Sequence, residues 1–340
     1  MSESPETTRT SPLQQVLATI QRWFDTEQAP DTAAVDADRI DWLRVLPFIG
    51  LHLACLAVFW VGASWFAVAT AVFLYAIRMF AITGFYHRYF SHKAFRTSRA
   101  IQFLFAALGA ACVQRGPLWW AAHHRHHHRH ADTEHDLHSP RHGFFRSHMG
   151  WFLTPAAFRT RLEDLPDLRS YPELRWLDRF DILVPILLAS VLYILGAWLE
   201  THAPGLGTSG PQLLVWGFFV STIVLFHVTV TINSLAHIWG SRRYKTTDTS
   251  RNNFFLALIT MGEGWHNNHH YYQSTANQGF FWWEVDFSYY ILKMLSWVGV
   301  VWDLRTPPRH ILEGKAAVDP IEPEVATEVP ALPPAAVPSV

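Results

Sequence analysis

Long apolar stretches separated by polar segments dominate the chain. The first covers residues 45–82, about twice the ~20 residues that a helix needs to cross a bilayer, and has the small residues Gly62, Ala63 and Ser64 near its middle. Two more cover residues 182–199 and 213–232 and are joined by a short uncharged connection. The pattern predicts four spanning helices in two hairpins, at about 45–62, 64–82, 182–199 and 213–232.

The remaining segments are expected to lie outside the bilayer. Segments 83–181 and 233–315 follow the two hairpins and contain only short apolar stretches, which fits a helical cap at one membrane surface. Segment 1–44 carries an amphipathic helix that Ser11 can cap, with Pro12 in its first position. Segment 316–340, rich in Ala, Pro, Val and Glu without periodicity, is expected to be disordered. The fold class is an all-α integral membrane protein whose four-span domain covers 45–315.

Charge distribution predicts the orientation of the spans. Neither hairpin turn contains Lys or Arg, whereas the middle segment and the segment after the last span are rich in both. Because Lys and Arg favour the cytoplasmic side, both termini and the cap are expected in the cytoplasm.

Composition agrees with a membrane protein and excludes several classes. Half of the residues are apolar and only 16% are charged, against about 25% in ordinary soluble proteins. The formal net charge of -1 gives no basic field for nucleic acid. The two cysteines are too few for a zinc ribbon or an iron–sulfur cluster. The 20 histidines are the unusual feature, and imidazole is the commonest metal ligand.

The histidines follow two matching helical patterns. The segments HRHHH and HNNHH each place histidines at i, i+3 and i+4, so each trio is expected to converge on one helix face, as a metal site requires. His123, His126 and His130 point elsewhere on the first helix. The six residues of the two trios are His124, His127, His128, His266, His269 and His270.

Three further histidines and one asparagine complete the pattern. His87 and His92 are five residues apart, about 140° around an α-helix, and so are expected to reach two different ions rather than share one. Asn233 and His237 are at i and i+4 at the end of the fourth span, on one face. All these groups emerge on the same side of the membrane, which predicts metal binding there.

Nine imidazoles are too many for one ion, so two ions that divide them four and five are expected. Imidazole suits zinc, copper, iron and nickel, and the spacing leaves the choice among them open. Three carboxylates are candidates to accept the second ring N–H of the ligands and so fix their tautomers: Asp132, Asp136 and Glu263.

The motifs HRYFSH, HRHHH, NSLAH and GEGWHNNHH, in this order between four apolar spans, resemble the membrane-bound fatty acid desaturases of the stearoyl-CoA desaturase-like, acyl-CoA delta-9 branch. The resemblance covers residues 45 to about 312. It implies a non-haem di-iron centre with the nine histidines as ligands and Asn233 holding an iron through water. It also implies an O2-dependent reaction that introduces a cis double bond, expected at delta-9, into a saturated acyl chain.

The resemblance also implies substrates and partners. The substrate would be a fatty acyl-CoA or an acyl-lipid, and Trp120 and Trp265, which flank ligands, are the best candidates to line an acyl tunnel. The related animal enzymes hold CoA with an Arg-Asp pair, where this chain has Ala122 and His123, so the head group stays open and His123 is a candidate contact. Two electrons would come from a separate protein of ferredoxin, rubredoxin or cytochrome b5 type. The location expected is a bacterial inner membrane, among its lipids.

Two other functions fit parts of the sequence. A hydroxylase or alkane-type monooxygenase would use the same scaffold, but those enzymes carry a glutamate directly after the first histidine of a box, where this chain has Arg88, Arg125 and Asn267. A histidine-rich metal transporter would need polar residues at mid-membrane depth, whereas the histidine motifs lie beyond apolar spans.

Overall fold

The computed structural model describes residues 11–28 and 39–314 and is almost entirely helical, which confirms the predicted fold class. Four helices are long and apolar enough to cross a membrane: Trp42–Val61, Trp65–Ser91, Leu183–His202 and Gly210–Ile238. The predicted spans therefore exist, but the second and fourth extend well beyond the residues expected. The expected disordered segment 316–340 lies outside the described residues.

Each span is built from shorter helical pieces. The first contains α2 (Trp42–Ala54) and α3 (Val58–Val61), and the second contains α4 (Trp65–Phe80) followed by the π-helix η4 (Ala81–Ser91). The third is α9 (Leu183–His202). The fourth joins α10 (Gly210–Gln212), the π-helix η10 (Leu213–Val220) and α11 (Ser221–Ile238).

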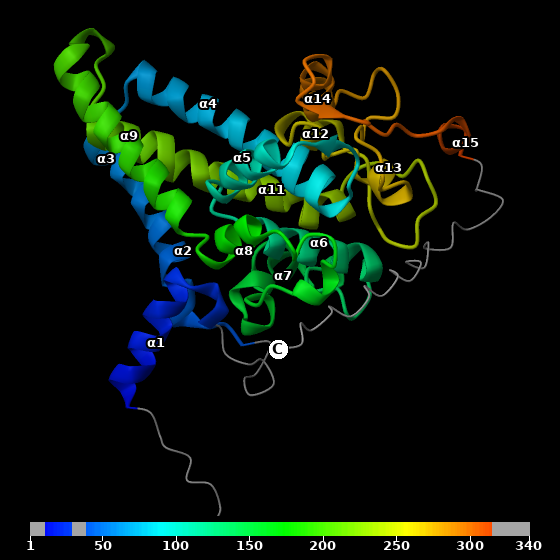
Figure 1. The fold of residues 1–340 in the computed structure, drawn as a ribbon, viewed down its shortest axis with the longest axis horizontal. Helices are drawn as coiled ribbons and strands as arrows, with labels where there is room; N and C mark the ends of the chain where they lie inside the picture. Colours follow the sequence, from blue (N-terminus) through cyan, green and yellow to red (C-terminus); the bar gives the residue numbers. More distant parts are fainter. Residues whose placement is uncertain (1–10, 29–38, 315–340) are drawn as a thin grey trace, which may run out of the picture. The chain divides into compact units, whose positions relative to one another are not determined.

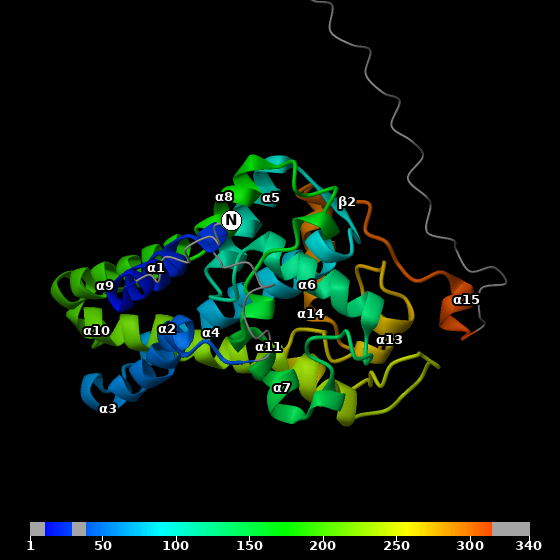
Figure 2. The same cartoon turned by 90° about the horizontal axis from the view of Figure 1, so that it is seen from below.

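The two hairpin turns lie together at one end of the four spans. Gln212 donates a side-chain hydrogen bond of 2.9 Å to the carbonyl of Val61, and Trp216 donates one of 2.8 Å to the carbonyl of Gly62. Figures 1 and 2 show α3 and α10 at this end, away from α6, α13 and α14. The hairpins therefore place both ends that lead into the cap on the same side.

The cap consists of short helices from both inter-span segments. The middle segment forms α5 (Arg99–Ala110), α6 (Pro117–His130), α7 (Phe144–His148) and α8 (Pro172–Arg179). After the last span come α12 (Phe254–Ile259), α13 (His266–Tyr271) and α14 (Phe287–Trp297). Two-residue strands, β1 (Arg96–Thr97) and β2 (Val301–Trp302), pair antiparallel and join the two parts. Residues 307–314 belong to a separate unit that contains α15 (Arg309–Leu312).

The N-terminal helix has the capping signal that the sequence predicts. In α1 (Pro12–Phe24) the side chains of Ser11 and Gln14 each accept a hydrogen bond from the backbone N–H of the other residue. Leu13 and Leu17 of its apolar stripe are exposed, which suits contact with a membrane surface, whereas Trp23 near its end lines a cavity of the protein.

A buried carboxylate holds the start of α6, the helix that carries the first histidine trio. Asp178 accepts hydrogen bonds from the backbone N–H of Trp119 at 2.7 Å and from the hydroxyl of Thr160 at 2.6 Å. Gly116 lies so close to Asp178 that a Cβ there would clash with it. Burial raises the pKa of Asp178 to about 6 despite these hydrogen bonds.

Asp178→Ala is expected to destabilise the protein, because it leaves the buried N–H of Trp119 without an acceptor. The expected loss is about 1–3 kcal/mol, measured as a fall in the melting temperature of the detergent-purified protein. Glu163→Ala, at an exposed position in the same segment, is the matched control and should change the melting temperature little. Equal effects of the two variants would contradict the capping role of Asp178.

Candidate metal centre

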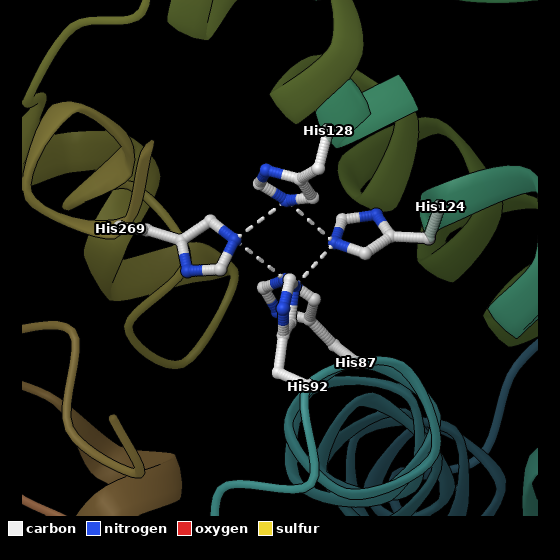
Figure 3. Close-up of side chains that lie close together, drawn as sticks. All are labelled: His87, His92, His124, His128 and His269. Carbon is white, nitrogen blue, oxygen red and sulfur yellow. Dashed lines mark hydrogen bonds between the residues drawn. The ribbon is translucent and has the colours of Figure 1, made fainter. Parts of the chain in front are cut away.

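Five histidines gather in what we call the first histidine group. Its members come from the end of η4, from α6 and from α13, and their rings face a common centre (Figure 3). Four contacts between Nε2 atoms, of 2.8–3.0 Å, connect the rings in series. The members are His87, His92, His124, His128 and His269.

Four more histidines form the second histidine group. Its members come from α6, α11 and α13, and the Nε2 atoms of His237 and His266 are 3.1 Å apart. The ligand atoms of the group all lie within 4.8 Å of one another. The members are His127, His237, His266 and His270. The nine predicted histidines are therefore brought together in groups of five and four.

The expectation that His87 and His92 reach different ions is wrong, because both belong to the first histidine group. The reason is local backbone geometry: Ala81–Ser91 is a π-helix rather than an α-helix. The N–H of His92 donates to the carbonyl of His87 at 3.2 Å, the i→i+5 bond of that geometry. Residues five apart therefore lie above one another, and the 140° separation of an α-helix does not apply.

The expectation that each trio converges on one point is also wrong. In α6, His124 and His128 belong to the first group and His127 to the second, whereas in α13, His269 belongs to the first group and the pair His266 and His270 to the second. Positions i and i+4 lie on one flank of a helix and i+3 on the other, about 60–100° away by the 3.6-residue turn. Each helix thus gives a pair to one group and a single histidine to the other.

Buried carboxylates orient the imidazoles from behind. Asp136 lies 3.0 Å from Nδ1 of His127, and Asp132 lies 3.4 Å from Nδ1 of His237. Glu263 lies 2.5 Å from Nδ1 of His87. All three carboxylates named from the sequence therefore contact ring nitrogens. An Nδ1–H donated to a carboxylate leaves the lone pair of Nε2 free for a metal.

The sequence reasoning missed two orienting residues. Asp248 lies 2.9 Å from Nδ1 of His270, and the side-chain amide of Gln278 donates at 2.8 Å to Glu263, the carboxylate that contacts Nδ1 of His87. Asp248 belongs to a polar loop without helical spacing, and Gln278 lies between α13 and α14, so no periodicity could have indicated either residue.

Hydrogen bonds made by Asn267 and Asn268, the two asparagines of HNNHH, fix α13 in place. Oδ1 of Asn252 accepts hydrogen bonds from the backbone N–H groups of Asn267 and Asn268, which are free at the start of this helix. Asn268 donates in turn to the carbonyl of Gln278 and to Glu284. These side chains are buried and tie the second trio to the loops around it.

Electrostatics favour neutral imidazoles beside ionised carboxylates. Burial lowers the pKa of His124, His128 and His269 well below the usual value. Burial also lowers the pKa of His270 to about 4, although Asp248 opposes this shift. Burial disfavours the charge of Asp136 and Asp248, but neighbouring histidines outweigh it and lower the pKa of both carboxyls. Imidazoles that stay neutral keep a lone pair that a metal ion could accept.

Protons alone cannot satisfy the first histidine group. Nε2 of His124 contacts Nε2 of both His92 and His128, and Nε2 of His269 contacts Nε2 of both His87 and His128. A ring nitrogen carries either one proton or one lone pair, so each can make only one well-directed hydrogen bond, and these nitrogens cannot satisfy both of their contacts. A cation at the common centre would accept all five lone pairs. The residues present thus fit a metal ion.

A cavity of about 260 Å³ lies beside the metal centre. Its wall includes His124 and Asn233 on one side, and aromatic residues between them and the start of the first span. A second cavity of about 40 Å³ is lined by residues of both histidine groups, by Asn233 and by Trp120. Asn233 therefore lines the space next to the two histidine groups.

The three residues predicted to contact substrate differ in their position relative to the two cavities. Trp120 lines both cavities and stacks on His124, as expected of a residue beside an acyl chain. Trp265 lines neither of these two cavities, and its indole N–H donates to the carbonyl of Val285, so its substrate contact stays a prediction. His123 is buried in the wall of the larger cavity rather than at the surface.

Comparison with known proteins identifies the family. The sequence model described as fatty acid desaturase matches residues 63–295. Delta-9 acyl-lipid desaturase 1 of Arabidopsis thaliana is 34% identical over 275 residues, 79% of this chain and 85% of the relative. The acyl-CoA C20 Delta5-desaturase of Anemone leveillei is 35% identical over 274 residues, 78% of this chain and 82% of the relative.

The match to a third relative extends over nearly the whole length of that relative. The sn-2 palmitoyl-lipid 9-desaturase of Nostoc sp. (strain 36) is 33% identical over 288 residues, 82% of this chain and 95% of the relative. The four apolar spans and the histidine groups define an integral membrane oxidoreductase with a candidate metal centre. The chain belongs to the fatty acid desaturase family, as the resemblance of its motifs implied.

His128→Ala is expected to remove a nitrogen from the first histidine group and to lower the metal content of the purified protein. His126, two positions earlier on α6, instead contacts the carbonyl of His135 and the guanidinium of Arg161, so His126→Ala should keep the full content. Metal is measured by mass spectrometry of acid-digested protein. Equal losses in the two variants would contradict the geometry of α6.

Asp248→Asn is expected to weaken metal binding about 10–100-fold, because the neutral amide is a poorer acceptor for the Nδ1–H of His270. Metal release during titration with a chelator measures this change. Asp303→Asn, at an exposed ion pair with Arg96, is the control and should release metal like the unmodified protein. Release at the unmodified rate from Asp248→Asn would remove the proposed orienting role.

Proposed function

We propose that this protein is an O2-dependent fatty acyl desaturase that introduces a cis double bond, at delta-9, into a saturated acyl chain. The two histidine groups would hold two iron ions, with Asn233 contributing through a water molecule. The observation that carries the proposal is the arrangement of nine imidazoles, six buried and three half-buried, in groups of five and four, beside a cavity whose wall includes several Phe and Trp side chains.

Iron is favoured over zinc because the family reaction is an oxidation. Removing two hydrogens from unactivated methylene groups requires an oxidant, which two bound irons would supply from O2 and two external electrons. A shell of neutral nitrogen ligands on redox-inert zinc offers no such chemistry. Both histidine groups consist of imidazoles alone. No carboxylate or thiolate of the described residues belongs to either group.

The residues of the chain would position the substrate and keep water out. Trp120, packed on His124 and on Tyr86, provides a rigid wall against which methylene groups can lie beside the metal centre. The carboxylates Asp132, Asp136 and Asp248 would hold the Nδ1 protons of three histidines in place when metal is bound. The second histidine group is buried and the first is partly buried, which would limit access of bulk water to the reacting carbons.

The substrate class follows the relatives, whose names include both acyl-lipid and acyl-CoA desaturases. We infer that the chain acts on one of these acyl carriers and receives electrons from a separate donor protein of ferredoxin, rubredoxin or cytochrome b5 type. The excess of Lys and Arg outside the hairpin turns supports a cytoplasmic cap and cytoplasmic termini. A bacterial inner membrane is the location that we propose.

Expression in a host that lacks its own desaturase tests the proposed function. Fatty acids of the expressing cells should contain chains two hydrogens lighter than the saturated parents, with the double bond at delta-9, and purified protein should contain iron. Anaerobic cells and cells expressing His128→Ala should lack the product. Hydroxylated chains in place of unsaturated ones, or zinc in place of iron under ample iron supply, would refute the proposal.

A further inference from the structure

The larger cavity contains hydrogen-bond donors for which the described residues provide no acceptor. Arg44, Trp23 and Trp151 belong to the wall of this cavity. Nη1 of Arg44 and the indole nitrogens of the two tryptophans are buried and have no hydrogen-bond partner among the described residues. By contrast, Trp119 in the same wall donates its indole N–H to the carbonyl of Ala157 at 2.6 Å. Guanidinium and indole groups only donate, so the complementary ligand must offer acceptors.

The same part of the cavity carries excess positive charge. Arg44 lies near Arg22 and Arg115, and all three line the cavity. Two carboxylates are close, but each has another partner: Asp181 pairs with Arg115 at 2.7 Å, and Asp41 accepts the backbone N–H of Arg44 at 3.2 Å. Three guanidinium groups thus face two carboxylates, which leaves a net charge suited to an anion.

Packing and backbone geometry hold these arginines in place. The guanidinium of Arg44 lies 4.3 Å from the centre of the Phe158 ring, and Arg115 donates to the carbonyl of Phe158 at 3.2 Å. Arg115 has a φ angle of 70° and Val113, also in the wall, one of 58°, a conformation that residues with side chains seldom adopt. Backbone strain of this kind persists where the surroundings fix a functional position.

We propose that Arg44, Arg115 and Arg22 bind a phosphate group of the acyl carrier, while the acyl chain extends along the same cavity toward Trp120 and His124. This inference rests on the proposed function and names its substrate class: acyl chains on a phosphate-bearing carrier, either the phosphopantetheine thioester of acyl-CoA or the phosphodiester of a phospholipid. Chains on uncharged galactolipids lack the required anion.

His123 lies in the wall of the same cavity, and neither of its ring nitrogens has a hydrogen-bond partner among the described residues. The charge for an anionic head group is supplied here from the start of the first span and from the loop before α6.

Equilibrium binding to the purified full-length protein tests the inference without turnover. Three ligands are compared by thermophoresis in one detergent: palmitoyl-CoA, dipalmitoyl phosphatidylglycerol and dipalmitoyl monogalactosyldiacylglycerol. The unmodified protein should bind at least one phosphate-bearing ligand at least tenfold more tightly than the galactolipid. The phosphate-bearing ligand that binds more tightly identifies the carrier.

Arg44→Gln should weaken binding of that ligand at least tenfold and leave binding of the galactolipid unchanged. Arg44→Lys, which keeps the charge, should recover part of the loss. Arg39→Gln, which removes an exposed arginine just before the same span, should have no effect. Metal content and gel-filtration behaviour equal to those of the unmodified protein establish that each variant is folded, and Arg115→Gln replaces Arg44→Gln if that variant does not fold.

Equal affinity for the charged and uncharged lipids, no detectable binding of any of the three, or an equal loss for all three in Arg44→Gln would overturn the inference. A failure of the proposed function can be distinguished from a failure of this inference. A protein that distinguishes the ligands as expected but forms no unsaturated product in the deficient host would keep the phosphate site and lose the desaturase assignment.

Discussion

The structure depends on the hydrogen bond that a metal-facing imidazole donates from Nδ1 to a buried carboxylate. Asp136, Asp248 and Glu263 each make this contact, and it leaves the Nε2 lone pair of the histidine directed inward. Carboxylates and imidazoles are costly to bury singly but compensate each other as pairs. The packing of α6, α11 and α13 around these pairs therefore serves the metal centre as much as the hydrophobic core.

One departure from regular helix geometry adapts the spans to this task. The second span changes from α-helix to π-helix at Ala81 and keeps that geometry to Ser91, just before His92. The change brings His87 above His92 and buries Arg88 against Glu263 and Asp286, at 3.2 and 3.0 Å. A span that anchors the protein in the membrane thus also supplies ligands and a positive charge that stabilises an orienting carboxylate.

Much of the site could be predicted because a helix repeats its faces regularly. The i, i+3, i+4 spacing identified the six histidines of the trios, and four long apolar stretches identified the spans. Predictions failed where the backbone left the α-helix, as for His87 and His92, or where side chains meet across loops, as for Asp248. For Trp265, sequence proximity to His266 does not say which side of the chain its ring occupies, and its indole N–H donates to the carbonyl of Val285.

The sequence by itself determined a four-span membrane protein with nine histidines in a pattern typical of the desaturase family, because apolar length and helical period are local properties. Only the tertiary structure decided how those histidines divide, since each of α6 and α13 faces both groups at once. It also decided that arginines distant in sequence, Arg44 and Arg115, line one cavity with Trp120. Such contacts depend on how helices pack, which no spacing along a single segment encodes.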